Sequence, residues 1–397
     1  MAAGDFLGTG RLALTFENAF AEIKQLGGGS VCYGPVKWAN YKSAAPEGAE
    51  FQEEVSMKKS VFVAALASTT MLAGVAFAAD GDTLKAVKAR DQLICGVNVG
   101  LTGFGAPDAN GNYQGFDVAI CKAVAAAVLG DASKVKYVPT TGETRFTVLA
   151  SSEVDLLVRN STWTFSRDTD LKFDFVGVNY YDGQGFMVKK DLGVSSAKEL
   201  DGSAVCIQTG TTTELNLADF FKANNMTYTP VAVQSDAEGQ RQYLAGTCDA
   251  YTTDASGLAA SRATMSDAEN HIILPEIISK EPLGPLVRHG DNNWGDIVRW
   301  TFNALVTAEE KGVTSKNYEE IGTTTTDPEV KRLLGLEGEL GPMMGLDTAF
   351  AKNAIAAVGN YGEIFAANIG EGTPIGLARG LNAQWTQGGL LYAPPFR

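Results

Sequence analysis

Short apolar runs alternate with amphipathic stretches along most of the chain. Runs of three to seven residues rich in apolar or β-forming side chains, bounded by polar turns, are typical of buried strands. The strands expected on this basis are 93–99, 135–138, 154–158, 204–208, 231–233 and 249–253. Apolar residues at three- and four-residue intervals between these runs predict helices over 117–129, 145–150, 214–224 and 236–244. Strands alternating with helices predict an α/β protein with doubly wound, mostly parallel sheets.

The order strand, polar loop, helix, strand, helix, strand occurs twice, which predicts two α/β lobes. We expect residues 79–183 in lobe 1, 184–281 in lobe 2, and 282–397 in a return to lobe 1 that ends in C-terminal helices. The forward connection is expected at 183–189, the return at 274–288, and the last helices at 296–311, 327–334 and 348–369. Ligands of open α/β sheets bind at the carboxyl ends of strands, so the site is expected in the cleft between the lobes.

An uncharged stretch of 19 residues, 60–78, follows Met57-Lys58-Lys59 and ends in Ala76-Phe77-Ala78. A basic start, an apolar centre and small residues at the end predict a signal peptide over 57–78, cleaved between Ala78 and Ala79. A membrane anchor is the alternative, since 19 uncharged residues could just span a bilayer. Residues 1–56 are interpreted as an extension from a mispredicted start, with a cytoplasmic appendage as the alternative.

Four cysteines follow the expected cleavage site, whereas Cys32 lies in the extension. An even number in an exported chain indicates disulfides, and four cysteines allow three pairings. We favour Cys95–Cys121 and Cys206–Cys248, because each pair then lies within one half of the chain. Buried free thiols are the alternative. No metal site is expected, because there is no C-x-x-C and the chain has only two histidines.

Composition narrows the classes of function. Lys+Arg 32 against Asp+Glu 46 gives a net charge of −14, which argues against nucleic acid as a partner. No cofactor is expected either. The glycines at 96, 100, 103 and 105 superficially suggest dinucleotide binding, but Pro107 continues the loop where a helix would have to begin. A flexible cleft wall is the better interpretation. Motifs of common hydrolases, zinc proteases and P-loop NTPases do not occur.

Polar residues that could hold a zwitterion stand at the carboxyl ends of strands in both lobes. Asn160 and Thr162 follow the strand at 154–158, and Arg167 comes within about one turn. A guanidinium matches a carboxylate, although a surface Arg167 paired with Asp168 or Asp170 is equally compatible with the residue types.

The second lobe offers the opposite charge. Asp254 ends the strand at 249–253 and could bind an ammonium group, or could simply cap the helix that follows. Gly210, Thr211 and Thr212 end another strand and open a helix, a geometry that suits a carboxylate. A ligand that bridges the arginine and the aspartate would favour a closed cleft.

From Met57 onward the chain resembles periplasmic substrate-binding proteins of polar amino-acid ABC transporters (family 3 solute-binding proteins), particularly the general L-amino-acid type. The resemblance rests on the signal and on these stretches: CGVNVGLTGFGAPDANGNYQGFDVAICKAVAAAV, RNSTWTFSRDTDLKFDF, YYDGQGFMV, IQTGTTTEL, CDAYTTD and LPEIISKEPLGPLVRHGD. It implies a two-lobed fold with two hinge crossings, a periplasmic location and a monomer. It also implies that free L-amino acids bind in the cleft and pass to a membrane permease.

Carried over residue by residue, the resemblance assigns the ligand carboxylate to Arg167, helped by Thr162 and Thr212, and the ammonium group to Asp254. Side-chain contacts would come from around Leu101 and Phe104. Many relatives have an aromatic ring at Leu101 and an acidic residue at Asn98, and both departures fit broad specificity. The alternative is an exported enzyme on the same fold, such as a cyclohexadienyl dehydratase. Its acid/base group would have to be Asp254 or Glu143.

Overall fold

The computed structural model describes residues 80–397. The predicted signal peptide, the extension before it and Cys32 lie outside the described residues. Within residues 80–397, no helix is both long and apolar enough to cross a bilayer.

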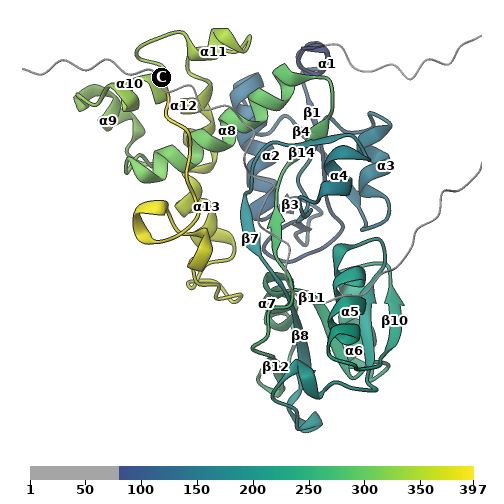
Figure 1. The fold of residues 1–397 in the computed structure, drawn as a ribbon. Coiled ribbons are helices and arrows are strands. Elements are labelled where there is room, and N and C mark those ends of the chain that lie inside the picture. The colour runs from purple at the N-terminus through teal and green to yellow at the C-terminus, as the bar shows by residue number, and fades with distance from the viewer. Residues whose placement is uncertain (1–79) are drawn as a thin grey trace, which may run out of the picture. The chain divides into compact units, whose positions relative to one another are not determined.

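Lobe 1 is built on a five-stranded sheet with strand order β4-β1-β5-β14-β6. Strands β1, β4 and β14 of this sheet are labelled in Figure 1. These strands are β1 (Leu93–Asn98), β4 (Val135–Thr140), β5 (Leu156–Leu157), β6 (Phe173–Phe175) and β14 (Leu286–Arg288). β4, β1 and β5 are parallel, and β14 is antiparallel to both of its neighbours. The helices along this part of the chain are α1 (Asp82–Arg90), α2 (Phe116–Leu129), α3 (Arg145–Ala150) and α4 (Phe165–Thr169). A two-stranded hairpin, β2 (Ala106–Pro107) and β3 (Tyr113–Gln114), precedes α2.

Lobe 2 repeats the architecture with strand order β10-β9-β11-β8-β12. Its strands are β8 (Gln184–Lys189), β9 (Ala204–Gln208), β10 (Thr229–Val233), β11 (Ala250–Asp254) and β12 (His271–Ile273). Its helices are α5 (Thr212–Ala223), α6 (Asp236–Leu244) and α7 (Ala255–Ala263). β10, β9 and β11 are parallel, while β8 is antiparallel to β11 and β12. Both sheets therefore present the carboxyl ends of three parallel strands, as the alternating pattern predicts.

The lobes are joined by an antiparallel strand pair, β7 (Tyr180–Asp182) and β13 (Glu281–Leu283). This corrects the connections expected from the sequence. Residues 184–189 form β8, which is buried inside the sheet of lobe 2, because Gly185 to Val188 is a short apolar run that fits between two strands. The return segment likewise ends in β14 of lobe 1, so the crossing itself is shorter than 274–288.

The chain after β14 is helical and completes the core of lobe 1. Its helices are α8 (Asn292–Glu310), α9 (Tyr318–Thr324), α10 (Pro328–Leu333), α11 (Leu340–Met343), α12 (Phe350–Val358) and α13 (Tyr361–Asn368). α12 packs against α2 and α8. The single helix expected over 348–369 is two helices: Gly359, with φ of 82°, ends α12, and Asn360 forms a capping box with Glu363 that begins α13. Short 3₁₀ turns occur at Lys190–Leu192, Ala197–Glu199, Ala268–Asn270, Gly380–Asn382 and Trp385–Gln387.

The C-terminal segment also holds one of the two crossing strands. The side chain of Asn382 accepts a hydrogen bond from Tyr181 N at 2.7 Å and donates one to Tyr181 O at 3.0 Å. Asn382 is itself buried, and Arg379 next to it forms a two-pronged ion pair with Glu309 of α8. β7 is therefore paired on one edge with β13 and held by a side-chain amide from the end of the chain.

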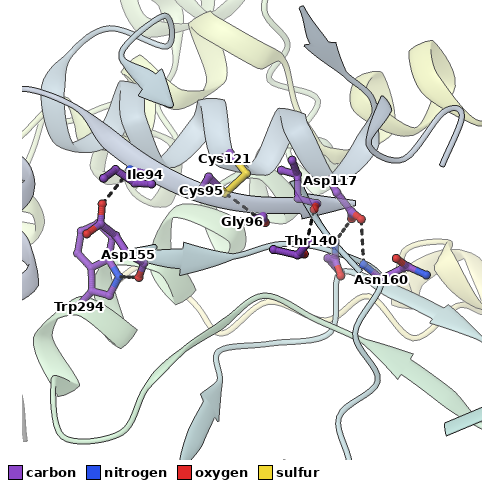
Figure 2. The surroundings of a disulfide bond; sticks show 11 residues. Ile94, Cys95, Gly96, Asp117, Cys121, Thr140, Asp155, Asn160 and Trp294 are labelled. Carbon is purple, nitrogen blue, oxygen red and sulfur yellow. Dashed lines mark hydrogen bonds between the residues drawn. A yellow bond between two sulfur atoms is a disulfide. The ribbon is translucent and has the colours of Figure 1, made fainter. Parts of the chain in front are cut away.

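Both favoured disulfides are confirmed. Cys95 of β1 bonds to Cys121 of α2, with Cα atoms 6.2 Å apart, and Cys206 of β9 bonds to Cys248, with Cα atoms 5.6 Å apart. Figure 2 shows the first bond fastening α2 to the strand beneath it. On the same helix, Asp117 accepts a hydrogen bond from the backbone N–H of Asn160 at 3.0 Å. One helix thus fixes both the sheet and the loop that follows β5.

Candidate functional site

A small cavity lies where the parallel strands of the two sheets end. Lobe 1 contributes Arg145, Arg159, Asn160 and Thr162, and lobe 2 contributes Gln208, Thr211, Thr212, Thr213, Thr253 and Asp254. The cavity has a volume of about 10 Å³, roughly the space of one water molecule. The polar residues predicted at the two strand ends therefore do converge, on a closed cleft.

Direct hydrogen bonds across the cleft account for its small size. Asn98 Nδ2 of lobe 1 donates to Asp236 Oδ2 of lobe 2 at 3.2 Å. Thr209 Oγ1 of lobe 2 donates to Glu143 Oε1 of lobe 1 at 2.9 Å. Each of these contacts joins polar side chains that water would otherwise solvate, so the structure is the closed form of the two lobes.

Asp254 is the buried carboxylate of the cavity. It precedes α7, but within the described chain its side chain makes no capping hydrogen bond, so it does not serve as a helix cap. Burial raises the pKa of Asp254 well above its usual range, the neighbouring Asp182 and Glu281 raise it further, and Arg145 opposes the shift. A carboxylate held without a capping role in a cleft is suited to a cationic group of a ligand.

Two arginines in the cavity were missed by the sequence reasoning. Arg145 and Arg159 are almost fully buried. Within residues 80–397, Arg145 Nε and Arg159 Nη2 have no hydrogen-bond partner. Burial lowers the pKa of both groups, and the charges of Arg159 and Arg167 add to the effect on Arg145. Burying an N–H group without a hydrogen-bond partner costs free energy. The part of the cavity lined by Arg145 and Arg159 is therefore suited to an anionic or carbonyl oxygen. A signal did exist for Arg159, which stands directly before Asn160 at the end of a predicted strand.

Arg167, the arginine predicted from the sequence, is buried in α4 beside the cavity. Its Nη1 donates to Thr162 O at 2.9 Å, and its guanidinium carbon lies 4.9 Å from the centre of the Phe146 ring. Burial lowers the pKa of Arg167 to about 10. It is therefore not a surface residue held by Asp168 or Asp170. Because it is not among the residues that line the closed cavity, its contact with a ligand carboxylate stays a prediction.

The remaining polar residues come from the loop after β5 and from the start of α5. Asn160 is held by Asp117 in a conformation with a φ of 20°, which is uncommon for a residue other than glycine. Thr211 is the N-cap residue of α5, but its hydroxyl donates to Gln208 O at 2.7 Å. No side chain of the described residues caps α5. The first-turn N–H groups of α5 are thus left facing the cleft, as an anion site requires.

Gly210, next to Thr211, has a φ of 71°, and its carbonyl oxygen accepts a hydrogen bond from Arg145 Nη2 at 3.5 Å.

Leu101 and Phe104 lie in the core of lobe 1 and not in the lining of the cavity. Both are buried there, and Phe104 packs edge-on against Phe116 and Tyr180. Their contact with a ligand side chain stays a prediction.

Larger cavities lie elsewhere but have less suitable chemistry. One of about 590 Å³ borders the β2–β3 hairpin and the loop after α13, and the described residues that line it carry no charge. Among residues 80–397, no cluster of three or more His, Cys, Asp or Glu side chains could hold a metal ion. The small charged cavity between the lobes is therefore the better candidate.

Comparison with known proteins identifies the family. The model of bacterial extracellular solute-binding proteins, family 3, matches residues 93–321, more than half of the chain. The chain belongs to this family. A glutamate/glutamine/aspartate/asparagine-binding protein of Rhodobacter capsulatus is 73% identical over 341 residues, covering 86% of this chain and 100% of the relative. A general L-amino acid-binding periplasmic protein of Rhizobium johnstonii is 56% identical over 343 residues, with coverage of 86% and 100%.

A solved structure agrees with this membership. A periplasmic binding protein from Brucella ovis with glutathione bound is 53% identical, has a TM-score of 0.78, and covers 81% of this chain and 100% of its own. The fold expected from the sequence, two α/β lobes around a cleft, is that of this solute-binding family.

Proposed function

We propose that the protein binds free L-amino acids in the cleft and delivers them to the permease of an ABC transporter. The observation that carries this proposal is the pairing of a buried carboxylate, Asp254, with arginines and an uncapped helix N-terminus in one closed cavity. To bind the ammonium and carboxylate groups of one zwitterion, a site has to present a negative and a positive group only a few ångströms apart. The relatives support the class: two are named as amino-acid-binding proteins, and a third, 50% identical, is named as a putative amino-acid ABC transporter-binding protein.

In this proposal Asp254 binds the ammonium group of the ligand. The carboxylate is bound by Arg167, which would turn from Thr162 O toward the cleft, together with Thr212 and the first-turn N–H groups of α5. Thr211, Gly210 and Asn160 line the site beside these groups, and the ligand side chain is contacted from lobe 1 around Leu101 and Phe104. The lobe bounds 79–183, 184–281 and 282–397 are proposed on the same basis, with opening about β7 and β13 to admit the ligand.

We further propose that the preferred ligands carry a side-chain carboxylate or amide. Arg145 and Arg159 are not needed for the backbone of an amino acid, yet both line the cavity, and each has a buried nitrogen without a hydrogen-bond partner among residues 80–397. A second oxygen group on the ligand would satisfy them. The R. capsulatus relative is named for four ligands of this class, which supports the assignment.

The test is calorimetric titration of the mature protein with a panel of L-amino acids. We expect tight, reversible binding without turnover, and tighter binding of L-glutamate than of L-alanine. Arg145→Met should weaken L-glutamate binding by at least about 2 kcal/mol, because the side-chain oxygen loses a buried cationic partner. L-alanine binding should change much less. Arg262→Met, outside the cavity, is the matched control.

Two outcomes separate the claims. If no amino acid binds, or if arogenate or prephenate is converted to product, the transport function is wrong. If neutral amino acids bind as tightly as acidic ones and Arg145→Met affects both equally, the function stands but the assigned side-chain preference is wrong.

The protein is proposed to act in the periplasm after cleavage of the signal between Ala78 and Ala79. Support comes from the basic start and small-residue end of 57–78 and from periplasmic relatives. N-terminal sequencing of the exported protein tests it. A mature chain that begins upstream of Ala79 would contradict the proposed cleavage site.

A further inference from the structure

Glu281 is a buried carboxylate in the crossing strand β13, at the edge of the cleft. Its Oε2 accepts hydrogen bonds from Thr162 Oγ1 of lobe 1 at 2.5 Å and from Thr212 Oγ1 of lobe 2 at 3.0 Å. Its Oε1 accepts from Asn216 Nδ2 of α5 at 2.7 Å and from Ser279 Oγ at 2.6 Å. An ionised carboxylate has about four acceptor positions, and these four donors fill them.

The two threonines that contact Glu281 are also the hydroxyl donors assigned to the ligand carboxylate. A threonine hydroxyl has a single proton to donate. Thr162 and Thr212 both line the cavity, and their oxygens are only 3.3 Å apart. While both protons point at Glu281, neither hydroxyl can donate to a second carboxylate. At about 10 Å³ the closed cavity has no space for an amino acid, so a ligand has to separate these groups in order to occupy it.

The position of Glu281 also links the lobes through the hinge. Neighbouring backbone contacts tie β13 to lobe 1, since Trp163 N donates to Pro282 O at 2.8 Å. Two of the four side-chain donors, Thr212 and Asn216, belong to α5 of lobe 2. The carboxylate therefore connects lobe 1 and the crossing strand to the helix that opens onto the cleft.

We propose that Glu281 competes with the ligand carboxylate for the hydroxyl groups of Thr162 and Thr212. In the absence of ligand Glu281 accepts both hydrogen bonds and stabilises the closed cleft, and it loses them when a ligand binds. This inference rests on the proposed function for its ligand. Binding exchanges one carboxylate for another, so Glu281 lowers the affinity for amino acids and makes ligand-free closure possible.

The test compares the wild type with Glu281→Gln, using L-glutamate and L-isoglutamine, in which the α-carboxylate is replaced by an amide. Glutamine keeps the shape but presents an NH₂ group to one pair of donors and a neutral oxygen to the other. We expect Glu281→Gln to bind L-glutamate about tenfold more tightly, the equivalent of one net hydrogen bond. L-isoglutamine, which lacks the competing charge, should gain much less. Glu276→Gln, on the same return segment but bonded to Ser196 and Ala197 away from the cleft, is the matched control.

Unchanged or weaker binding of L-glutamate by a folded Glu281→Gln variant would overturn the proposal. Small-angle scattering of the ligand-free proteins is a second measurement, independent of ligand identity. The radius of gyration of ligand-free Glu281→Gln should exceed that of the wild type, and equal values would also overturn the proposal. If the wild type binds no amino acid, the proposed function fails, and the scattering result alone decides whether Glu281 holds the lobes together.

Discussion

Ligand binding is expected to release a proton from the carboxylates around Asp254. Burial raises the pKa of Asp254 well above that of a solvated aspartate, and burial raises the pKa of Asp182 to about 6. In the ligand-free cleft these groups therefore hold protons at pH values where a solvated aspartate is ionised. An ammonium group placed beside Asp254 favours the ionised form, so the bound state holds fewer protons than the free state.

The sign and size of the effect follow from linkage. Because protons are released on binding, affinity rises with pH, up to the raised pKa of the ligand-free carboxylates. Full release of one proton gives a tenfold gain in affinity for each pH unit, or about 1.4 kcal/mol. For Asp182 the gain is expected as the pH rises toward its raised pKa of about 6, and for Asp254 as the pH rises toward its own raised pKa.

Calorimetry in two buffers of different ionisation enthalpy measures the released protons directly. At pH 5 and pH 6 we expect binding heats that differ between buffers, and affinity for L-glutamate that increases from pH 5 to pH 7. Asp254→Asn should abolish most of the release and weaken binding by about 2–5 kcal/mol, because the ammonium group loses its buried partner. Asp219→Asn, on the exposed side of α5, is the matched control. Identical heats in both buffers with a flat affinity would show that Asp254 is already ionised in the free protein, and the reasoning would be wrong.

Three further predictions concern stability and are checked by urea unfolding. Replacing Cys206 and Cys248 together by alanine should cost about 4 kcal/mol on the loop-entropy model, for a sequence separation of 42 residues; a loss below about 1 kcal/mol would contradict that model here. Gly115→Ala should cost at least about 2 kcal/mol, since a Cβ there would lie 2.3 Å from Phe104 O at a φ of 131°. Gly130→Ala, with a φ of 69° and open space, should cost less, and equal losses would refute the steric reason. Asn382→Ala should cost about 1–3 kcal/mol by leaving the backbone of Tyr181 unsatisfied, and an unchanged stability would mean that water replaces the amide.

Much of the fold was predictable because its signals are local. Strand β9 and helices α3 and α6 lie where the apolar pattern places them, and the disulfides follow from the assignment of each pair to one half of the chain. The crossing strands were harder to locate, because 184–189 reads equally well as a connector or a buried strand until its neighbours are known. The break at Gly359 was missed because the apolar spacing of 348–369 continues across it.

Part of the site was predictable because strand ends, like the strands themselves, are marked by local sequence signals. Asp254 and Thr162 stand at strand ends, where sequence alone places ligand contacts, and both line the cavity. Arg145 was missed because its role depends on burial and on an unpaired nitrogen, which are properties of the assembled lobes. Glu281 was missed because its four donors are separated from it by as many as 119 positions in the sequence.

The two disulfides have a mechanical consequence. Among the described residues, each covalent bridge closes a loop inside a single lobe, and neither encloses β7 or β13. The disulfides therefore stiffen each lobe and leave the connection between the lobes without a disulfide. In an oxidising compartment the disulfides can therefore raise the free energy of unfolding of each lobe without restricting the opening that admits a ligand. A reductant would lower the stability of the lobes without changing the range of that opening.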